Sequence, residues 1–255
     1  MTPPVLEVQD LSISFGGLKA VAGFGLTLRP GALEGLIGPN GAGKTTVFNL
    51  LSGVYTADSG RFVLDGADLR GFSAYRISHA GIARTFQNIR VFSHLTVLEN
   101  VLVGFHQSIR YGYWDAFLLT GRFRNDEAAM EQQALALLER VGLASRAGDN
   151  ARDLPYGDQR RLEIARALAT HPKVLLLDEP AAGLNTVEKE QLMGLIAKIR
   201  DEFKVAILVI EHDMKLVMGI CERITVLDHG EVIATGTPKE IQSNPKVIEA
   251  YLGVS

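Results

Sequence analysis

At 255 residues, 47% of them hydrophobic, the chain is long enough for one sizeable core with an appended subdomain. A formal net charge of −3 without a dense run of basic residues argues against nucleic acid as a partner. Cys221 is the single cysteine, which excludes an internal disulfide and fits a reducing cytoplasm. The sequence shows no signal peptide and no run of roughly 18 apolar residues, so we expect membrane contact only through another protein.

The first quarter of the chain predicts strands around a glycine-rich loop. Apolar runs bounded by turn signals predict strands over residues 5–13, 26–28 and 33–37. Residues 45–51 have helix-compatible spacing, and residues 61–64, between two glycines, predict a strand of a small antiparallel sheet. A strand, loop and helix are thereby placed in the order that a phosphate-binding loop requires.

The middle of the chain changes to helical periodicity. Over residues 97–169 the apolar positions recur at helical spacing, with Ala134, Leu138 and Val141 on one face of a segment whose other face is polar. We therefore expect a mostly helical insertion here.

The last third returns to alternating strands and helices. Buried strands are predicted over residues 174–177, 205–210 and 224–227, with a helix over residues 187–200. This alternation predicts a parallel sheet covered on both faces. A hairpin through His229-Gly230 should lead to a further strand at 232–234, and two short helices should begin near Thr237 and Asn244.

A phosphate-binding loop is the strongest signal in the sequence. Its glycines let main-chain N–H groups converge on phosphate oxygens at a helix N-terminus, where the helix dipole also favours an anion. Lys44 would neutralise the β- and γ-phosphates, the Thr45 hydroxyl would ligate Mg²⁺, and Thr46 would contact the α-phosphate. The loop consists of Gly38, Pro39, Asn40, Gly41, Ala42, Gly43, Lys44 and Thr45.

Two acidic residues follow the apolar strand predicted over residues 174–177. The carboxyl end of a central strand lies at the sheet edge where nucleotides bind, so Asp178 and Glu179 should lie there. We expect Asp178 to hold Mg²⁺, mainly through water. We expect Glu179 to be the general base for the water that attacks the γ-phosphate, the alternative being a solvated loop carboxylate.

Together with the phosphate-binding loop and the two acids, Gln87, His212 and a signature-like segment give the chain a resemblance to the ABC ATPase family, which extends over nearly its whole length. Gln87 resembles the Q-loop residue that senses the γ-phosphate through metal and water, where the helical subdomain joins the core. His212 resembles the switch histidine that contacts the γ-phosphate. Phe15 stands where the family places an aromatic ring that stacks on adenine, although a buried phenylalanine at a strand end is equally common.

A signature-like segment implies a dimer, because family members use it to reach the nucleotide of a second subunit. Pro155 replaces the usual serine and removes its hydroxyl, and Asp158 replaces the usual glutamine. Asp158 should turn away from phosphate, for instance by capping a helix over residues 159–168. Asn185 stands at the D-loop position where the family generally has aspartate, so equal activity of the two ATP sites is an open question. The signature-like residues are Leu154, Pro155, Tyr156, Gly157 and Asp158.

The family resemblance also implies the fold and its division. We expect an α/β P-loop NTPase of the ABC ATPase type, with a RecA-like parallel sheet core, an antiparallel β subdomain and a helical subdomain. One ABC ATPase domain should occupy residues 1–255. Its core and β subdomain should comprise residues 1–87 and 166–255, and its helical subdomain residues 88–165.

Within this family, several longer runs closely resemble the LivG-type ATPases of branched-chain amino acid importers. Such importers pair a LivG-type with a LivF-type ATPase beneath two permease subunits, and a solute-binding protein delivers the substrate outside. The resemblance implies an ATPase that uses ATP and Mg²⁺ on the cytoplasmic face of the membrane, as a heterodimer or homodimer. These residues do not separate branched-chain amino acids from amides, urea or aromatic compounds. The runs cover residues 156–166, 178–185, 210–218 and 250–253.

Three alternatives remain open from the sequence. The ATPase of a lipid or polysaccharide exporter has a similar length. A soluble ABC protein of DNA repair or translation would commonly carry two cassettes or long coiled-coil or zinc insertions, which this chain lacks. A P-loop kinase would leave the signature-like segment and His212 without a role.

Overall fold

A computed structural model describes residues 3–109 and 111–252, which form two compact units. The first unit extends to Gln87 and resumes at Lys173, and the second comprises Asn88–Pro172. The helix that follows the signature-like segment continues to Leu168 and packs on other helices of the second unit.

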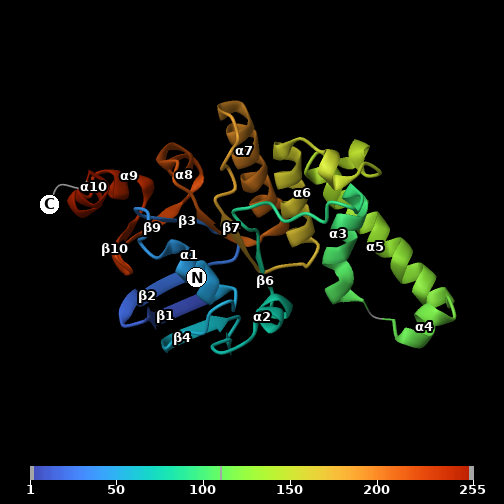
Figure 1. The fold of residues 1–255 in the computed structure, drawn as a ribbon, viewed down its shortest axis with the longest axis horizontal. Helices are drawn as coiled ribbons and strands as arrows, with labels where there is room; N and C mark the ends of the chain where they lie inside the picture. Colours follow the sequence, from blue (N-terminus) through green and yellow to red (C-terminus); the bar gives the residue numbers. More distant parts are fainter. Residues whose placement is uncertain (1–2, 110, 253–255) are drawn as a thin grey trace. The chain divides into compact units, whose positions relative to one another are not determined.

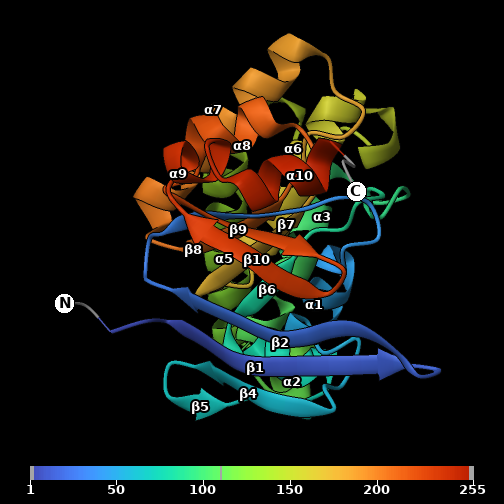
Figure 2. The same cartoon turned by 90° about the vertical axis from the view of Figure 1, so that its left-hand side faces the viewer.

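An antiparallel sheet opens the first unit, with strand order β2-β1-β4-β5 (Figure 2). β1 and β2 pair along their whole length, from Leu6 opposite Leu28 to Phe15 opposite Leu18. Only the last three residues of β2 were expected as a strand, because Gly23 and Gly25 interrupt its apolar alternation. The strands are β1 (Leu6–Phe15), β2 (Leu18–Leu28), β4 (Ser59–Leu64) and β5 (Ala67–Asp68).

The core of the first unit is a six-stranded sheet of order β10-β9-β3-β8-β7-β6. All neighbours are parallel except β10, which pairs antiparallel with β9 through the expected hairpin. Every residue of β3, β7 and β8 is buried, as expected for strands covered on both faces. The strands are β3 (Leu33–Ile37), β6 (Ile82–Arg84), β7 (Val174–Asp178), β8 (Ala206–Ile210), β9 (Arg223–Asp228) and β10 (Glu231–Gly236).

Helices cover this sheet, and several begin at residues suited to capping. The Asp213 side chain accepts hydrogen bonds from the first turn of α8, and Thr237 forms a capping box with Glu240 at the start of α9. α2 lies in a stretch for which no helix was predicted. The helices are α1 (Lys44–Leu51), α2 (Ala74–Ala80), α7 (Thr186–Phe203), α8 (Met214–Ile220), α9 (Pro238–Gln242) and α10 (Pro245–Leu252).

The second unit is helical, as its periodicity predicted (Figure 1, green to yellow). Ala134, Leu138 and Val141 are buried together on α5 and just after it. α3 and α6 approach closely at Gly104, where an added Cβ would lie 2.5 Å from the Arg166 carbonyl oxygen. The helices are α3 (Val97–Phe105), α4 (Tyr113–Phe117), α5 (Gly121–Arg140) and α6 (Tyr156–Leu168), with 3-10 turns η1 (His106–Ser108), η2 (Ala144–Arg146) and η3 (Ala151–Asp153).

In neither unit is any described helix both long and apolar enough to cross a bilayer.

Candidate nucleotide-binding site

The predicted phosphate-binding loop lies between β3 and α1, at the carboxyl end of the parallel strands. Two of its glycines are required by geometry. A Cβ on Gly38 would lie 2.0 Å from the Leu227 carbonyl oxygen, and one on Gly43 would lie 2.7 Å from the Ala20 carbonyl oxygen. Gly43 also has φ 101°, a value that favours glycine. The loop therefore adopts a compact shape that other residues would disturb.

Lys44 begins α1 and is only 6% exposed. Its Nζ donates hydrogen bonds to the carbonyl oxygens of Gly38 at 2.7 Å and Pro39 at 2.8 Å. Burial lowers the pKa of Lys44, while the negative charges of Glu179 and Asp178 raise it. The ammonium group is thus held inside the curve of the loop, near Asp178 at the end of β7 and Glu179 just after it.

The loop forms one wall of a cavity of about 360 Å³. The opposite wall includes Glu179 and His212, which follow β7 and β8 respectively, and further lining comes from the start of β2 and from Gly230. The parallel sheet brings these distant segments together because β3, β7 and β8 end at the same edge. The lining from the loop and α1 consists of Asn40, Gly41, Ala42, Gly43, Lys44, Thr45 and Thr46.

Glu179 is the centre of a three-residue cluster. Its Oε2 accepts a hydrogen bond from Gln87 Nε2 at 2.8 Å, and its Oε1 lies 2.5 Å from His212 Nε2. Glu179 has φ 47°, in the left-handed region that is uncommon for a residue other than glycine. The unusual backbone and the two partners aim the carboxylate at the cavity that also contains Lys44.

Asp178 is held by a residue that the sequence did not identify. Its Oδ2 lies 2.7 Å from Arg84 Nη2, and both side chains are almost completely buried. Arg84 Nη1 also donates to Asn49 Oδ1 at 2.7 Å and to Ser52 Oγ at 3.0 Å. No sequence motif marks Arg84, because its role depends on β6 lying beside β7.

A buried acid next to His212 was also missed. Glu211 Oε1 accepts a hydrogen bond from the Ala181 N–H at 2.7 Å, and Oε2 accepts one from the His212 N–H at 3.3 Å. Burial raises the pKa of Glu211, and these two N–H groups oppose that change. Glu211 therefore ties the loop after β8, which positions His212, to the loop after β7, which positions Glu179.

Two other predicted site residues have local partners. Phe15 ends β1, is exposed and contacts the Tyr55 ring edge-on at 5.2 Å between centroids. Phe15 does not line the 360 Å³ cavity, whose first lining residue in the sequence is Leu18. Asn185 caps α7, because its side chain accepts a hydrogen bond from the Glu188 N–H at 3.0 Å.

The signature-like segment lies in the second unit, at the start of α6. The helix begins at Tyr156, with Pro155 at the N-cap position, so the expected start at residue 159 was wrong. Proline is tolerated at this position because its fixed φ allows the observed value of −53° and its missing N–H is one that the start of a helix would leave without an intrahelical partner. Asp158 therefore does not cap the helix.

Asp158 instead forms ion pairs with two arginines of its own unit. Its carboxylate pairs with Arg146 at 3.5 Å and with Arg161 at 3.9 Å. Leu154 is buried before the helix, while Tyr156 is exposed at its start and Gly157 lies in its first turn. The acid is thus engaged within its own unit.

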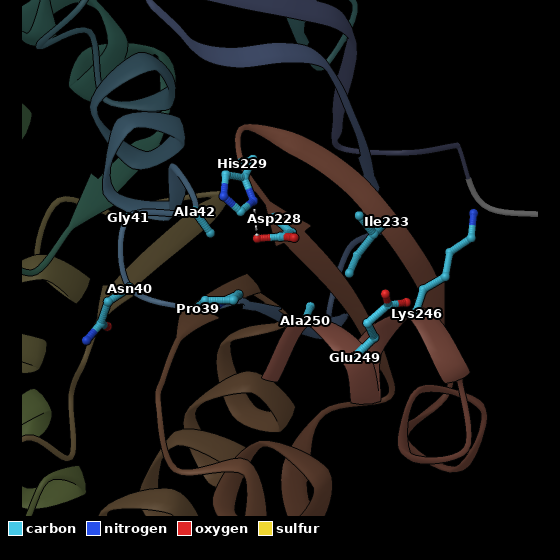
Figure 3. Close-up of a pocket in the computed structure, with 10 residues that line it drawn as sticks. All are labelled: Pro39, Asn40, Gly41, Ala42, Asp228, His229, Ile233, Lys246, Glu249 and Ala250. Atoms are coloured by element: carbon cyan, nitrogen blue, oxygen red, sulfur yellow. Dashed lines mark ion pairs between the residues drawn. The ribbon is translucent and has the colours of Figure 1, made fainter. Parts of the chain in front are cut away.

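A neighbouring cavity of about 670 Å³ also touches the loop (Figure 3). It shares residues 40–42 and His229 with the smaller cavity, and its other lining comes from Pro39, Asp228, Ile233 and α10. His229 Nδ1 lies 2.8 Å from Asp228 Oδ1. Neither Lys44 nor Glu179 lines it. The groups suited to phosphate chemistry therefore gather in the smaller cavity.

Comparison with known proteins agrees with this arrangement. Residues 21–182 match the family model described as ABC transporter, and residues 231–255 match the branched-chain amino acid ATP-binding cassette transporter model. The chain is 49% identical to the high-affinity branched-chain amino acid transport ATP-binding protein LivG of Escherichia coli (strain K12), over 99% of each chain. It is 47% identical to the corresponding protein BraF of Pseudomonas aeruginosa, again over 99% of each chain.

A solved structure shows the same fold. The chain superposes on the ADP conformation of an ATP-binding cassette of an ABC transporter with a TM-score of 0.85 and 29% sequence identity, covering 99% of this chain and 100% of that one. Fold, nucleotide loop and overall identity therefore lead to one conclusion: the chain belongs to the ABC transporter family, as one of its ATP-binding, ATP-hydrolysing members.

Proposed function

We propose that this chain is the ATPase subunit of an importer for branched-chain amino acids. The observation that carries the proposal is that Glu179 and His212 line one cavity with Lys44, while Gln87 donates a hydrogen bond to the Glu179 carboxylate. The C-terminal match to the branched-chain amino acid model and the identity to LivG favour an importer motor over a lipid or polysaccharide exporter.

Nucleotide binding would use groups that are already in place. The main-chain N–H groups of the loop would receive the phosphate oxygens, and Lys44 Nζ would exchange its two carbonyl partners for the β- and γ-phosphates. Phe15 would have to leave Tyr55, or share it, to stack on adenine.

The residues fit a magnesium ion bound with the nucleotide. Thr45 lines the cavity at the start of α1, and the second carboxylate oxygen of Asp178 accepts no hydrogen bond from any residue that the structure describes. Thr45, Gln87 and Asp178 would hold the ion, directly or through water. Bound there, Mg²⁺ would neutralise phosphate charge that develops during cleavage.

Hydrolysis would depend on Glu179 as general base. Its carboxylate would accept a proton as water attacks the γ-phosphorus, and the bond to the oxygen bridging the β- and γ-phosphates would break to give ADP and phosphate. His212 would keep Glu179 aimed at this water and contact the γ-phosphate. Gln87 ends the first unit, where it would couple the site to movement of the helical unit.

The transporter would supply the partners. We propose that the chain binds two permease subunits at the inner face of the membrane and dimerises with a LivF-like ATPase or with a second copy of itself. The segment from Leu154 to Asp158 would complete the nucleotide site of the other subunit. A solute-binding protein would act on the outer side, without contacting this chain.

Replacing Glu179 with Gln tests the catalytic part. The variant should bind MgATP in calorimetry as tightly as the natural chain, while phosphate release falls by roughly two to four orders of magnitude, the usual contribution of a general base. Retained turnover would remove Glu179 from its assigned role. Copurification from membranes tests the importer: permeases together with a solute-binding protein would support it, and a lipid-bridge apparatus in their place would contradict it.

A further inference from the structure

A third cavity, of about 840 Å³, lies at the opposite end of β3 from the phosphate-binding loop. Its lining comes from β1 and β2 of one sheet, from β9 and β10 of the other, and from β3 with the turn before it. β2 and β10 lie side by side (Figure 2). Its size is in the range of small-molecule sites. None of its lining residues belongs to the nucleotide site.

Glu34 is the unusual feature of this cavity. It is the second residue of β3, only 7% exposed, and it lines the cavity. Within residues 3–109 and 111–252, no group donates a hydrogen bond to its carboxylate or forms an ion pair with it. Burial raises the pKa of Glu34 to about 7, although Arg223 and Arg29 act to lower it. A buried acid without a partner is costly to a fold, so it calls for a functional explanation.

Two arginines flank this acid. Arg29 lies in the turn before β3, Arg223 begins β9, and both line the cavity. Neither forms an ion pair within 4 Å among the described residues, although both influence Glu34 electrostatically. The other acid of the wall, Glu222, is engaged by Arg200 at 3.0 Å. The two guanidinium groups are therefore available to a carboxylate, which they can bind in bidentate fashion.

The remaining walls are apolar or carry hydroxyl groups. Val8 and Leu26, both buried, contribute aliphatic surface from the antiparallel sheet. Thr225 and Thr235, whose hydroxyl oxygens are 3.5 Å apart, contribute polar surface from β9 and β10. One cavity thus combines an acid, two cationic groups and an aliphatic wall.

We propose that this cavity binds an α-amino acid with an aliphatic side chain. Its carboxylate would pair with Arg29 and Arg223, its ammonium group with Glu34, and its side chain would pack against Val8 and Leu26. A simple anion would leave Glu34 without a partner, and a simple amine would leave both arginines without one. A zwitterion satisfies all three groups.

At this site, the amino acid that the transporter imports would regulate ATP hydrolysis by the ATPase subunit. β3 runs from Glu34 directly into the phosphate-binding loop, so one strand joins the proposed site to the nucleotide site. This regulatory consequence rests on the proposed function, whereas binding does not.

Calorimetry of the purified full chain with L-leucine, without nucleotide, tests the proposal. We expect saturable binding, weakened about tenfold or more in Glu34→Gln and in Arg223→Met, because each loses a charge-assisted hydrogen bond. Glu231→Gln, an exposed acid of β10 outside the cavity, is the matched control and should bind as the natural chain does.

Two leucine analogues give a test that does not depend on folding of a variant. 4-Methyl-2-oxopentanoate lacks the ammonium group and 3-methylbutylamine lacks the carboxylate, so each should bind the natural chain at least about tenfold more weakly than leucine. No heat with millimolar leucine, or equal binding by Glu34→Gln, would overturn the proposal. Because nucleotide is absent, neither result bears on the ATPase function.

Discussion

Replacing Arg84 with Met should destabilise the first unit far more than a surface substitution. Arg84 Nη2 lies 2.7 Å from Asp178 Oδ2, and the two side chains are only 7% and 5% exposed. Removing one partner of a buried pair costs about 3–5 kcal/mol, because the remaining charge loses its partner without regaining water. For a unit of this size, each kcal/mol lowers the melting temperature by about 2–4 °C, so we expect a decrease of roughly 6–20 °C.

Scanning calorimetry of the nucleotide-free chain measures this effect. Lys173→Met is the matched control, since the ion pair of Lys173 with Asp65 has side chains 48% and 53% exposed and should contribute at most about 1 kcal/mol. The double variant Arg84→Met, Asp178→Asn should recover part of the loss, because it removes the isolated charge. If Arg84→Met and Lys173→Met melt within about 2 °C of each other, the reasoning from burial is refuted.

Three further predictions follow from single residues. Gly43→Ala should weaken MgATP binding and lower the melting temperature, whereas Gly41→Ala, with nothing within 4 Å of the added Cβ, should have the smaller effect in the same titration. Since the pKa of Glu34 is raised from 4.5 to about 7, protonation of Glu34 stabilises the folded chain. This stabilisation is full below pH 4.5 and is lost as pH rises through 7. In Glu34→Gln, the melting temperature should therefore change less between pH 4.5 and 7 than it does in the natural chain. The buried thiol of Cys221, whose pKa is raised to about 12, should react with iodoacetamide at pH 8 only after denaturation, and rapid labelling of the folded chain would contradict its burial.

Much of the secondary structure and several residues of the candidate nucleotide site were predictable from the sequence. The phosphate-binding loop, Glu179 and His212 each follow an apolar strand, and parallel strands end at one sheet edge, so local pattern alone implied their proximity. Likewise, the helical spacing of Ala134 and Leu138 predicted a buried face.

Other features depended on pairing between distant segments. β2 is an 11-residue strand because β1 pairs with it throughout, although its glycines obscure the alternation. Arg84 holds Asp178 only because β6 lies beside β7, and Glu34 borders a cavity only because β2, β9 and β10 enclose it. Local sequence determines where a chain can form a strand, a loop or a helix. Which side chains meet across 94 residues, as Arg84 and Asp178 do, is decided by the tertiary structure, since burial and ion pairing depend on neighbours that local pattern does not encode.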